Sequence, residues 1–244
     1  MNWRGLLVSV RNAAEAADAL AGGAAIVDVK EPLAGPLGAA SAAEIGAIAR
    51  EVGEARPWTF ACGELEDGVD AIVARVGGAV DALAGGAVAP AAFKVGLAGM
   101  AGRPWRDALA AIRGRVPGGV AHAAVAYADW QRAAAPPPAE VIEVAYALGC
   151  GVLLVDTFDK QSAGLLGTAP EREIAGWVAR AHHHGLAVAL AGRVALAEIP
   201  AVMALGADVV ALRSAVCSNG RHGPVDRRLV ADAVAIASAG ALQQ

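Results

Sequence analysis

Lysine is the residue type whose scarcity and placement say most about chemistry in this chain. The sequence has 244 residues and 20 basic side chains, and only three of these are lysine: Lys30, Lys94 and Lys160. Arginine can replace lysine as a surface charge. It cannot form an imine or accept a proton, because its guanidinium stays protonated in proteins. We therefore expect the three lysines to act through their amines.

Two aspartates lie close to these lysines in the sequence. Asp28 precedes Lys30 by two residues, so both side chains point to the same face if this segment is a strand. Asp156 precedes Lys160 by four residues. A neighbouring carboxylate raises the pKa of an amine, whereas burial and neighbouring cations lower it. One lysine is therefore expected to be a neutral nucleophile near pH 7, and these residues leave open which one.

The last two expected strands are followed by loops that suit a phosphate group. Gly192 permits close backbone approach, and Arg193 or Arg213 could pair bidentately with phosphate oxygens. With Ser214, these residues form the predicted phosphate-binding set. A phosphorylated small molecule is therefore the expected ligand.

Other polar groups receive smaller roles. Tyr127 and Asp129 follow the fifth expected strand and are predicted to contact substrate, support the site or relay protons. The consecutive histidines at 182–184 point in different directions on a helix, so they are not expected to share a metal. The sequence lacks the HExxH, P-loop and nucleophile-elbow motifs, and neither a metal nor a cofactor is predicted.

The elements that must position these groups alternate along the chain. Eight short apolar runs are predicted as strands, and each is followed by a segment with helical spacing. The strands are predicted at 5–10, 25–29, 58–61, 92–95, 121–126, 152–155, 187–190 and 209–212. The helices are predicted near 12–21, 41–52, 66–84, 104–113, 138–148, 170–184, 194–205 and 225–239.

Eight strand-then-helix units predict an α/β protein, a single (β/α)8 TIM barrel that spans residues 1–244. A doubly wound open sheet is the alternative. It is disfavoured because no GxGxxG motif follows the first strand and because eight units are counted. In a barrel, active sites lie at the C-terminal ends of the strands. The three lysines follow or end the second, fourth and sixth strands, and so lie on that rim.

The composition excludes several classes of partner. The formal charge is −4 and aromatic residues make up 4% of the chain, so no nucleic acid partner is expected. The mean hydropathy is +0.47, but every apolar run is interrupted well before the length of about 18 residues that a membrane span needs. Three cysteines without a CxxC pair indicate a cytoplasmic protein. An exterior rich in alanine suggests a homo-oligomer.

Several segments together resemble one enzyme family. They are LLVSV at 6–10, IVDVKEP at 26–32 with GPLGA at 35–39, FKVGL at 93–97, YAD at 127–129, LVDT at 154–157, ALAG at 189–192 and DRRLV at 226–230. In this order they cover nearly the whole chain. The sequence is similar to the (5-formylfuran-3-yl)methyl phosphate synthases, also called 4-(hydroxymethyl)-2-furancarboxaldehyde-phosphate synthases.

This resemblance implies a TIM-barrel lyase that converts two molecules of glyceraldehyde 3-phosphate into a furan aldehyde phosphate, with loss of phosphate and water. The product is a precursor of the furan in methanofuran-type carriers of one-carbon metabolism. By the same resemblance Lys30 forms the Schiff base and Lys94 is the proton acceptor, while Asp28, Asp156 and Lys160 complete the site. The last loop is shorter and less lysine-rich than in archaeal members, a departure that concerns phosphate binding.

Two other functions stay open at this point. Another imine-forming barrel, such as a deoxyribose-phosphate-type aldolase, would use the same lysines but would yield no furan. A non-catalytic barrel that binds a phosphorylated metabolite would show stabilisation by its ligand without turnover.

Overall fold

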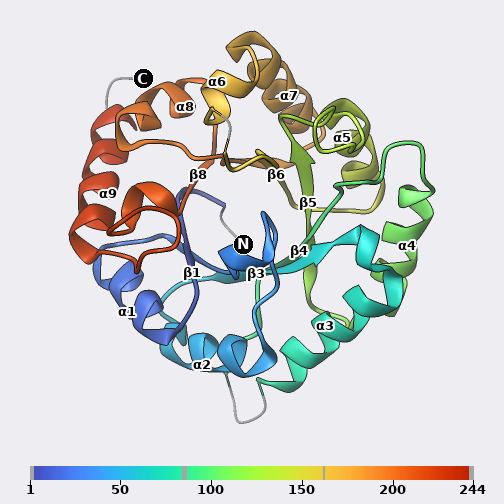
Figure 1. Ribbon diagram of the computed structural model, residues 1–244, viewed down its shortest axis with the longest axis horizontal. Helices are drawn as coiled ribbons and strands as arrows, with labels where there is room; N and C mark the ends of the chain where they lie inside the picture. Colours follow the sequence, from blue (N-terminus) through green and yellow to red (C-terminus); the bar gives the residue numbers. More distant parts are fainter. Residues whose placement is uncertain (1–2, 84–86, 162, 242–244) are drawn as a thin grey trace.

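The computed structural model describes residues 3–83, 87–161 and 163–241. Within these ranges eight parallel strands close into a barrel in sequence order, and helices surround it (Figure 1). Because β1 pairs with both β2 and β8, the predicted (β/α)8 barrel is confirmed and the doubly wound alternative is wrong. The strands are β1 (Gly5–Val10), β2 (Ile26–Val29), β3 (Trp58–Glu64), β4 (Ala92–Gly96), β5 (Ala121–Tyr127), β6 (Val152–Asp156), β7 (Ala187–Leu190) and β8 (Val209–Leu212).

The helices agree with the predicted segments, with three differences. The helix predicted at 66–84 begins only at Val69, because a 3-10 turn and Gly68, with φ 94°, precede it; residue 84 lies outside the described residues. The helix predicted at 194–205 is split into a 3-10 turn and α8. A helix of four residues, α6, has too short a pattern to be predicted. The helices are α1 (Ala13–Ala21), α2 (Ala42–Val52), α3 (Val69–Asp81), α4 (Trp105–Arg115), α5 (Pro138–Ala147), α6 (Leu165–Thr168), α7 (Glu171–His183), α8 (Ile199–Ala204) and α9 (Arg227–Ala241), with 3-10 turns at Pro32–Ala34, Leu65–Asp67, Leu196–Glu198 and Ser214–Val216.

The strands are buried on both faces, since one face lines the barrel and the other packs under the helices. Val27 and Val29 of β2 belong to the outer apolar layer, whereas Asp28 between them lines the barrel interior. The inner layer contains many small side chains, including Ala123 and Ala189. Alanine at these positions leaves room for a pocket inside the barrel.

Glycines end three helices before the next strand begins. Gly23, Gly149 and Gly206 have φ values of 93°, 67° and 95°, in the left-handed region that glycine adopts with little strain. These residues turn the chain back toward the barrel.

Four strands run past their predicted ends at the mouth of the barrel, three of them into polar residues. β3 reaches Glu64, β5 reaches Tyr127 and β6 reaches Asp156. An apolar pattern cannot signal a strand that continues through polar residues, and these added residues include groups of the site described below.

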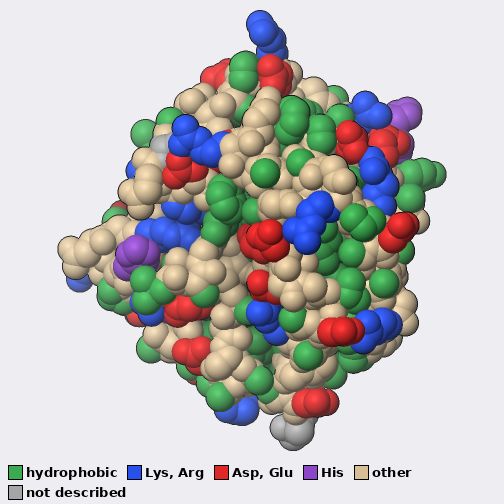
Figure 2. Space-filling view, turned by 45° about the vertical axis from the view of Figure 1, so that its right-hand side comes forward, with side chains coloured by type: hydrophobic (Ala, Val, Ile, Leu, Met, Phe, Trp, Pro, Cys, Tyr) green, Lys and Arg blue, Asp and Glu red, His purple; other side chains and the backbone are tan. Residues whose placement is uncertain are grey.

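Charged side chains of both signs are interspersed over the face of the molecule shown in Figure 2. Among the described residues, no helix combines the length and the apolar character needed to cross a membrane.

Candidate active site

A pocket opens inside the barrel at the C-terminal ends of the strands. All three lysines of the sequence line it, together with two aspartates. These groups come from β2, β4 and β6 or from the residues directly after them. The structure therefore brings together the five residues predicted to be catalytic: Lys30, Lys94, Lys160, Asp28 and Asp156.

Asp28 is the centre of a buried hydrogen-bond network. Its carboxylate accepts hydrogen bonds from Ser9 Oγ at 3.1 Å and from Thr59 Oγ1 at 2.8 Å. It is also ion-paired with Lys94 Nζ, which donates to Thr59 Oγ1 at 3.2 Å. Ser9, Asp28 and Thr59 meet because they are paired in register across β1, β2 and β3. The Lys94 and Asp28 side chains are each 4% exposed, so each charge depends on the other.

Asp156 and Lys160 form a second ion pair at the end of β6. Lys160 Nζ lies 2.7 Å from Asp156 Oδ1 and also donates to the carbonyl oxygen of Thr157. Burial opposes ionisation of Asp156, but the charges of Lys160 and Lys30 outweigh it and hold the pKa of this carboxyl below its usual value. Asp156 is therefore a carboxylate at neutral pH, and it accepts a hydrogen bond from the Thr157 N–H at 2.8 Å.

Lys30 differs from the other two lysines. Its Nζ makes no hydrogen bond or ion pair within the part of the chain that the structure describes. Burial, with help from the charges of Lys160 and Arg221, lowers the pKa of Lys30 from 10.5 to about 8, although Asp156 and Asp28 oppose the shift. About a tenth of this amine is then neutral at pH 7. Lys30 thus combines an unpaired amine with a substantial neutral fraction.

The loops after β7 and β8 line the same pocket through all four predicted phosphate-binding residues, Gly192, Arg193, Arg213 and Ser214. Gly192 has φ 109°, and a Cβ atom there would lie 2.7 Å from Thr157 Cγ2. Only glycine therefore lets the loop after β7 approach the end of β6 so closely. Ser214 begins the 3-10 turn after β8.

Arg213 lines the pocket, but its guanidinium is already engaged by other groups of the protein. Its buried guanidinium donates twice to the Glu15 carboxylate and once to each of the carbonyl oxygens of Ser9, Arg221 and Gly223. A guanidinium has five N–H groups, so none is left for a phosphate. These bonds fix the loop after β8 against β1 and α1, so Arg213 lines the pocket without an N–H group free for the predicted phosphate.

Asp129 does not line the pocket. Its carboxylate accepts hydrogen bonds from the backbone N–H groups of Phe158 at 2.6 Å and Asp159 at 2.9 Å. Of the roles predicted for Asp129, its position fits support of the site, since these bonds hold the loop that carries Lys160.

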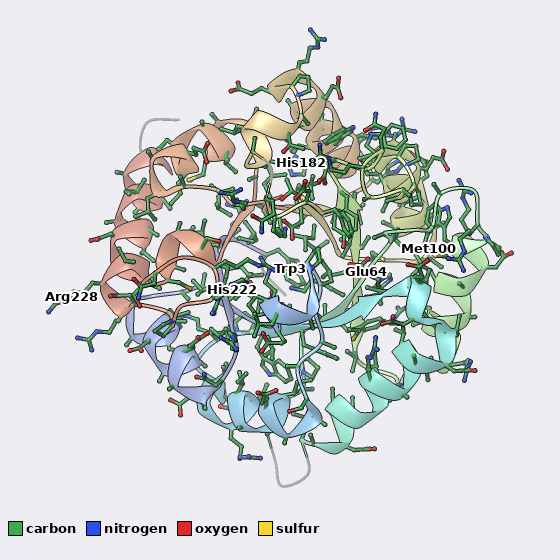
Figure 3. The ribbon with its side chains drawn as sticks, in the orientation of Figure 1. Trp3, Glu64, Met100, His182, His222 and Arg228 are labelled. Carbon is green, nitrogen blue, oxygen red and sulfur yellow. The ribbon has the colours of Figure 1, made fainter. Side chains whose placement is uncertain are left out.

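Tyr127 and Glu64 form a pair that the sequence does not reveal. The buried Tyr127 hydroxyl donates to Glu64 Oε1 at 2.6 Å, and Glu64 lies inside the ring of helices in Figure 3. Burial raises the pKa of Glu64, against the hydrogen bonds from Tyr127 and the Ala98 N–H. A Cβ atom at Gly96 would lie 2.0 Å from the Glu64 carboxylate, so this glycine makes room for the pair. Tyr127 does not line the pocket, and it too supports the site from outside it.

Arg221 lines the pocket but is absent from the predicted set. Its Nη2 donates to the carbonyl oxygen of Gly35 at 3.1 Å, and burial lowers its pKa. In the sequence it lies in a polar, glycine-containing run at 218–223 that is typical of an ordinary turn. The one feature of the sequence that points to Arg221 as a site residue is its position after the last strand of the barrel.

Histidines and cysteines take no part in this pocket. His182 contacts Asp208 at 2.8 Å, and His184 contacts Glu143 at 3.0 Å. Over the described ranges, no group of three or more His, Cys, Asp or Glu side chains is arranged to hold a metal.

The fold and the pocket together define a (β/α)8-barrel protein with a site built on lysines and carboxylates. A family model described as 4-HFC-P synthase matches residues 6–234. The (5-formylfuran-3-yl)methyl phosphate synthase of Methanopyrus kandleri is 36% identical over 239 residues, which cover 92% of this chain and 95% of the relative. That of Methanocaldococcus jannaschii is 35% identical over 233 residues, covering 92% and 96%. The chain belongs to the (5-formylfuran-3-yl)methyl phosphate synthase family and is an enzyme.

Solved structures support the fold alone. The 3-hexulose-6-phosphate synthase from Salmonella typhimurium matches with a TM-score of 0.65 at 15% identity, over 95% of this chain and 99% of the other. The thiamine phosphate pyrophosphorylase from Pyrococcus furiosus matches with a TM-score of 0.61 at 16% identity, over 98% of both chains.

Proposed function

We propose that this enzyme condenses two molecules of glyceraldehyde 3-phosphate into (5-formylfuran-3-yl)methyl phosphate, inorganic phosphate and two molecules of water. These products account for every atom of the two substrates. The names of the relatives support the product, and the pocket offers the amines that an imine mechanism needs. The enzyme is then a lyase of methanofuran-type cofactor biosynthesis that acts in the cytoplasm, without a cofactor of its own and as a homo-oligomer.

The unpaired amine of Lys30, with its pKa of about 8, is the observation that carries this proposal. A neutral amine attacks the aldehyde carbon of the first triose phosphate, and loss of water leaves an imine. The protonated imine withdraws electrons from the neighbouring carbon. The proton on C2 of the substrate therefore becomes acidic.

Lys94 is the proposed acceptor of this C2 proton. The Asp28 carboxylate, in contact with Lys94 Nζ, positions this amine for the exchange. Ser9 and Thr59 hold Asp28 in place for this exchange through their hydrogen bonds. Removal of the C2 proton and departure of phosphate from C3 together form a β-elimination, which releases the inorganic phosphate.

Lys160 and Asp156 complete the reaction site. The Lys160 ammonium neutralises charge on the departing phosphate, and the Asp156 carboxylate stabilises the positive charge of the imine on Lys30. Both groups move protons during carbon–carbon bond formation, ring closure and dehydration. Gly192, with Arg193 and Ser214, holds the phosphate group of the imine-bound triose until it departs.

Product analysis tests the proposal. Glyceraldehyde 3-phosphate is incubated with the purified enzyme, and we expect one inorganic phosphate for every two triose phosphates consumed, with a furan absorbance in the near ultraviolet. A simple aldolase would consume triose phosphate without releasing phosphate or producing this absorbance. A non-catalytic barrel would consume none. Either of these results would contradict the proposal.

A further inference from the structure

A broad groove continues from the catalytic pocket onto the rim of the barrel. It has a volume of about 610 Å³ and runs between the loops that follow β2, β6 and β8. Pockets that enclose a small molecule commonly span roughly 300–1,000 Å³. The groove and the pocket are contiguous, because the same four residues line both: Lys160, Arg193, Ser214 and Arg221.

The pocket itself is too small for two substrates. Its volume is about 40 Å³, which is room for about three water molecules. That is far below the roughly 300–1,000 Å³ of pockets that enclose a small molecule. One substrate can therefore place its aldehyde end against Lys30, while the other must lie mainly in the groove.

The charge of the groove is predominantly positive. Four lysine or arginine side chains line its described part, against the single carboxylate of Asp159. Lys160 is paired with Asp156, and Arg132 with Asp159. A groove with this excess of cations attracts a dianion such as a phosphate monoester.

Arg221 is the cation best placed to bind that dianion. It lies where the groove meets the pocket. Its guanidinium makes one hydrogen bond to the described residues, and the acceptor is a neutral group, the carbonyl oxygen of Gly35. Its charge acts on both Lys30 and Asp156, so it lies close to the reacting centre. A partly buried cation without a carboxylate partner is stabilised by an anionic ligand, and its free N–H groups suit bidentate binding of phosphate.

We propose that this groove binds the phosphate group of the second triose phosphate, with Arg221 as the main ligand. The inference rests on the proposed function, which requires two phosphorylated substrates at one site. The phosphate of the first, imine-bound triose lies at Gly192 and Ser214, and the carbon chain of the second reaches past Lys160 toward Lys30. Leu33, which is 67% exposed, adds an apolar side chain to the lining of the groove.

Binding stoichiometry tests this arrangement without relying on turnover. The probe is glycerol 3-phosphate, which has no aldehyde and cannot form an imine. By titration calorimetry we expect two molecules to bind each wild-type chain and one to bind Arg221→Ala. Arg221→Lys keeps the charge but loses the bidentate geometry, so its second site should weaken at least tenfold. The matched control is Arg228→Ala, which removes an exposed arginine at the outer edge of the helices (Figure 3) and should still bind two.

The outcomes separate this inference from the proposed function. One molecule bound to the wild type, or two bound to Arg221→Ala with unchanged affinity, would overturn the groove as a phosphate site. Furan production by the wild type is measured independently and tests the reaction itself. If both hold, Arg221→Ala should raise the KM for glyceraldehyde 3-phosphate at least tenfold, and trapping of the first triose on Lys30 should persist.

Discussion

Two neighbouring strands of the barrel each carry a buried basic side chain. One lies on the inward face and is ion-paired, and the other lies on the outward face among apolar side chains. Lys94 of β4 points inward and is paired with Asp28. His122 of β5 lies in the outer layer, where its ring stacks on Phe93 with centroids 4.9 Å apart. Burial lowers the pKa of His122 to about 4, and its Nε2 has no hydrogen-bond partner among the described residues.

The difference follows from what each face offers. The inward face supplies carboxylate and hydroxyl oxygens from adjacent strands, so Lys94 can keep a charge there. The outer layer around His122 consists of apolar side chains such as Leu109 and Val141, and only the neutral imidazole is stable among them. On these two strands the buried charge thus lies on the inward face, and among the described residues Lys30 is the lysine of the pocket without a partner.

The largest effect is expected from Lys30→Arg, which preserves the charge of the inward face but removes the amine chemistry. Because arginine cannot form an imine, kcat/KM for furan formation should fall at least about a thousandfold. Furan absorbance measures the rate, and thermal unfolding checks that the variant is folded. Retention of a tenth of the wild-type rate would contradict covalent catalysis at Lys30.

Asp28→Asn breaks the inward pair and leaves the Lys94 charge buried without a partner. The free energy of unfolding should fall by about 3–5 kcal/mol, measured by urea denaturation. The double variant Asp28→Asn with Lys94→Met removes the uncompensated charge, so it should recover most of this loss while staying inactive. A loss below about 1 kcal/mol in the single variant would show that the two charges are not coupled.

His122 makes the outer layer sensitive to acid. Its folded-state pKa of about 4 lies below the ordinary value of 6.5, so the unfolded chain binds the proton first as the pH falls. Stability is therefore lost between pH 6.5 and 4, and this group alone should account for about 2 kcal/mol at pH 5 relative to pH 7. Urea denaturation of wild type and His122→Leu at both pH values isolates this term. Equal losses in the two proteins would contradict it.

The smallest effect concerns the environment of the Lys30 amine. Arg221 helps to lower the pKa of Lys30, so Arg221→Gln should move the midpoint of Lys30 reactivity above the wild-type value of about 8. The rate of imine trapping with unphosphorylated glyceraldehyde, measured from pH 6 to 10, reports this midpoint without involving a phosphate site. A midpoint that is unchanged or lower would show that Arg221 does not act on Lys30.

The fold and the five lysine and aspartate groups could be predicted because their signals are local. Alternation of apolar strands with helical spacing indicates the barrel, and the scarcity of lysine singles out Lys30, Lys94 and Lys160 by residue type alone. The rim of a barrel then brings together residues that follow alternate strands.

The remaining parts of the site depend on contacts between distant segments. Arg213 resembles a phosphate ligand in the sequence, but its carboxylate partner, Glu15, lies 198 residues away. Likewise, the pairing of Glu64 with Tyr127 depends on the space left by Gly96, and Arg221 lies in a loop without regular structure. Residue type and spacing carry no information on such partners.

Borohydride trapping during exposure to glyceraldehyde 3-phosphate, followed by peptide mass spectrometry, tests covalent catalysis at Lys30 most directly. Reduction makes the imine permanent and identifies the lysine that carries it. We predict one adduct per chain, on Lys30, that forms with a pH midpoint near 8 and disappears in Lys30→Arg. An adduct on Lys94 or Lys160 in the wild type, or none on any lysine, would contradict it.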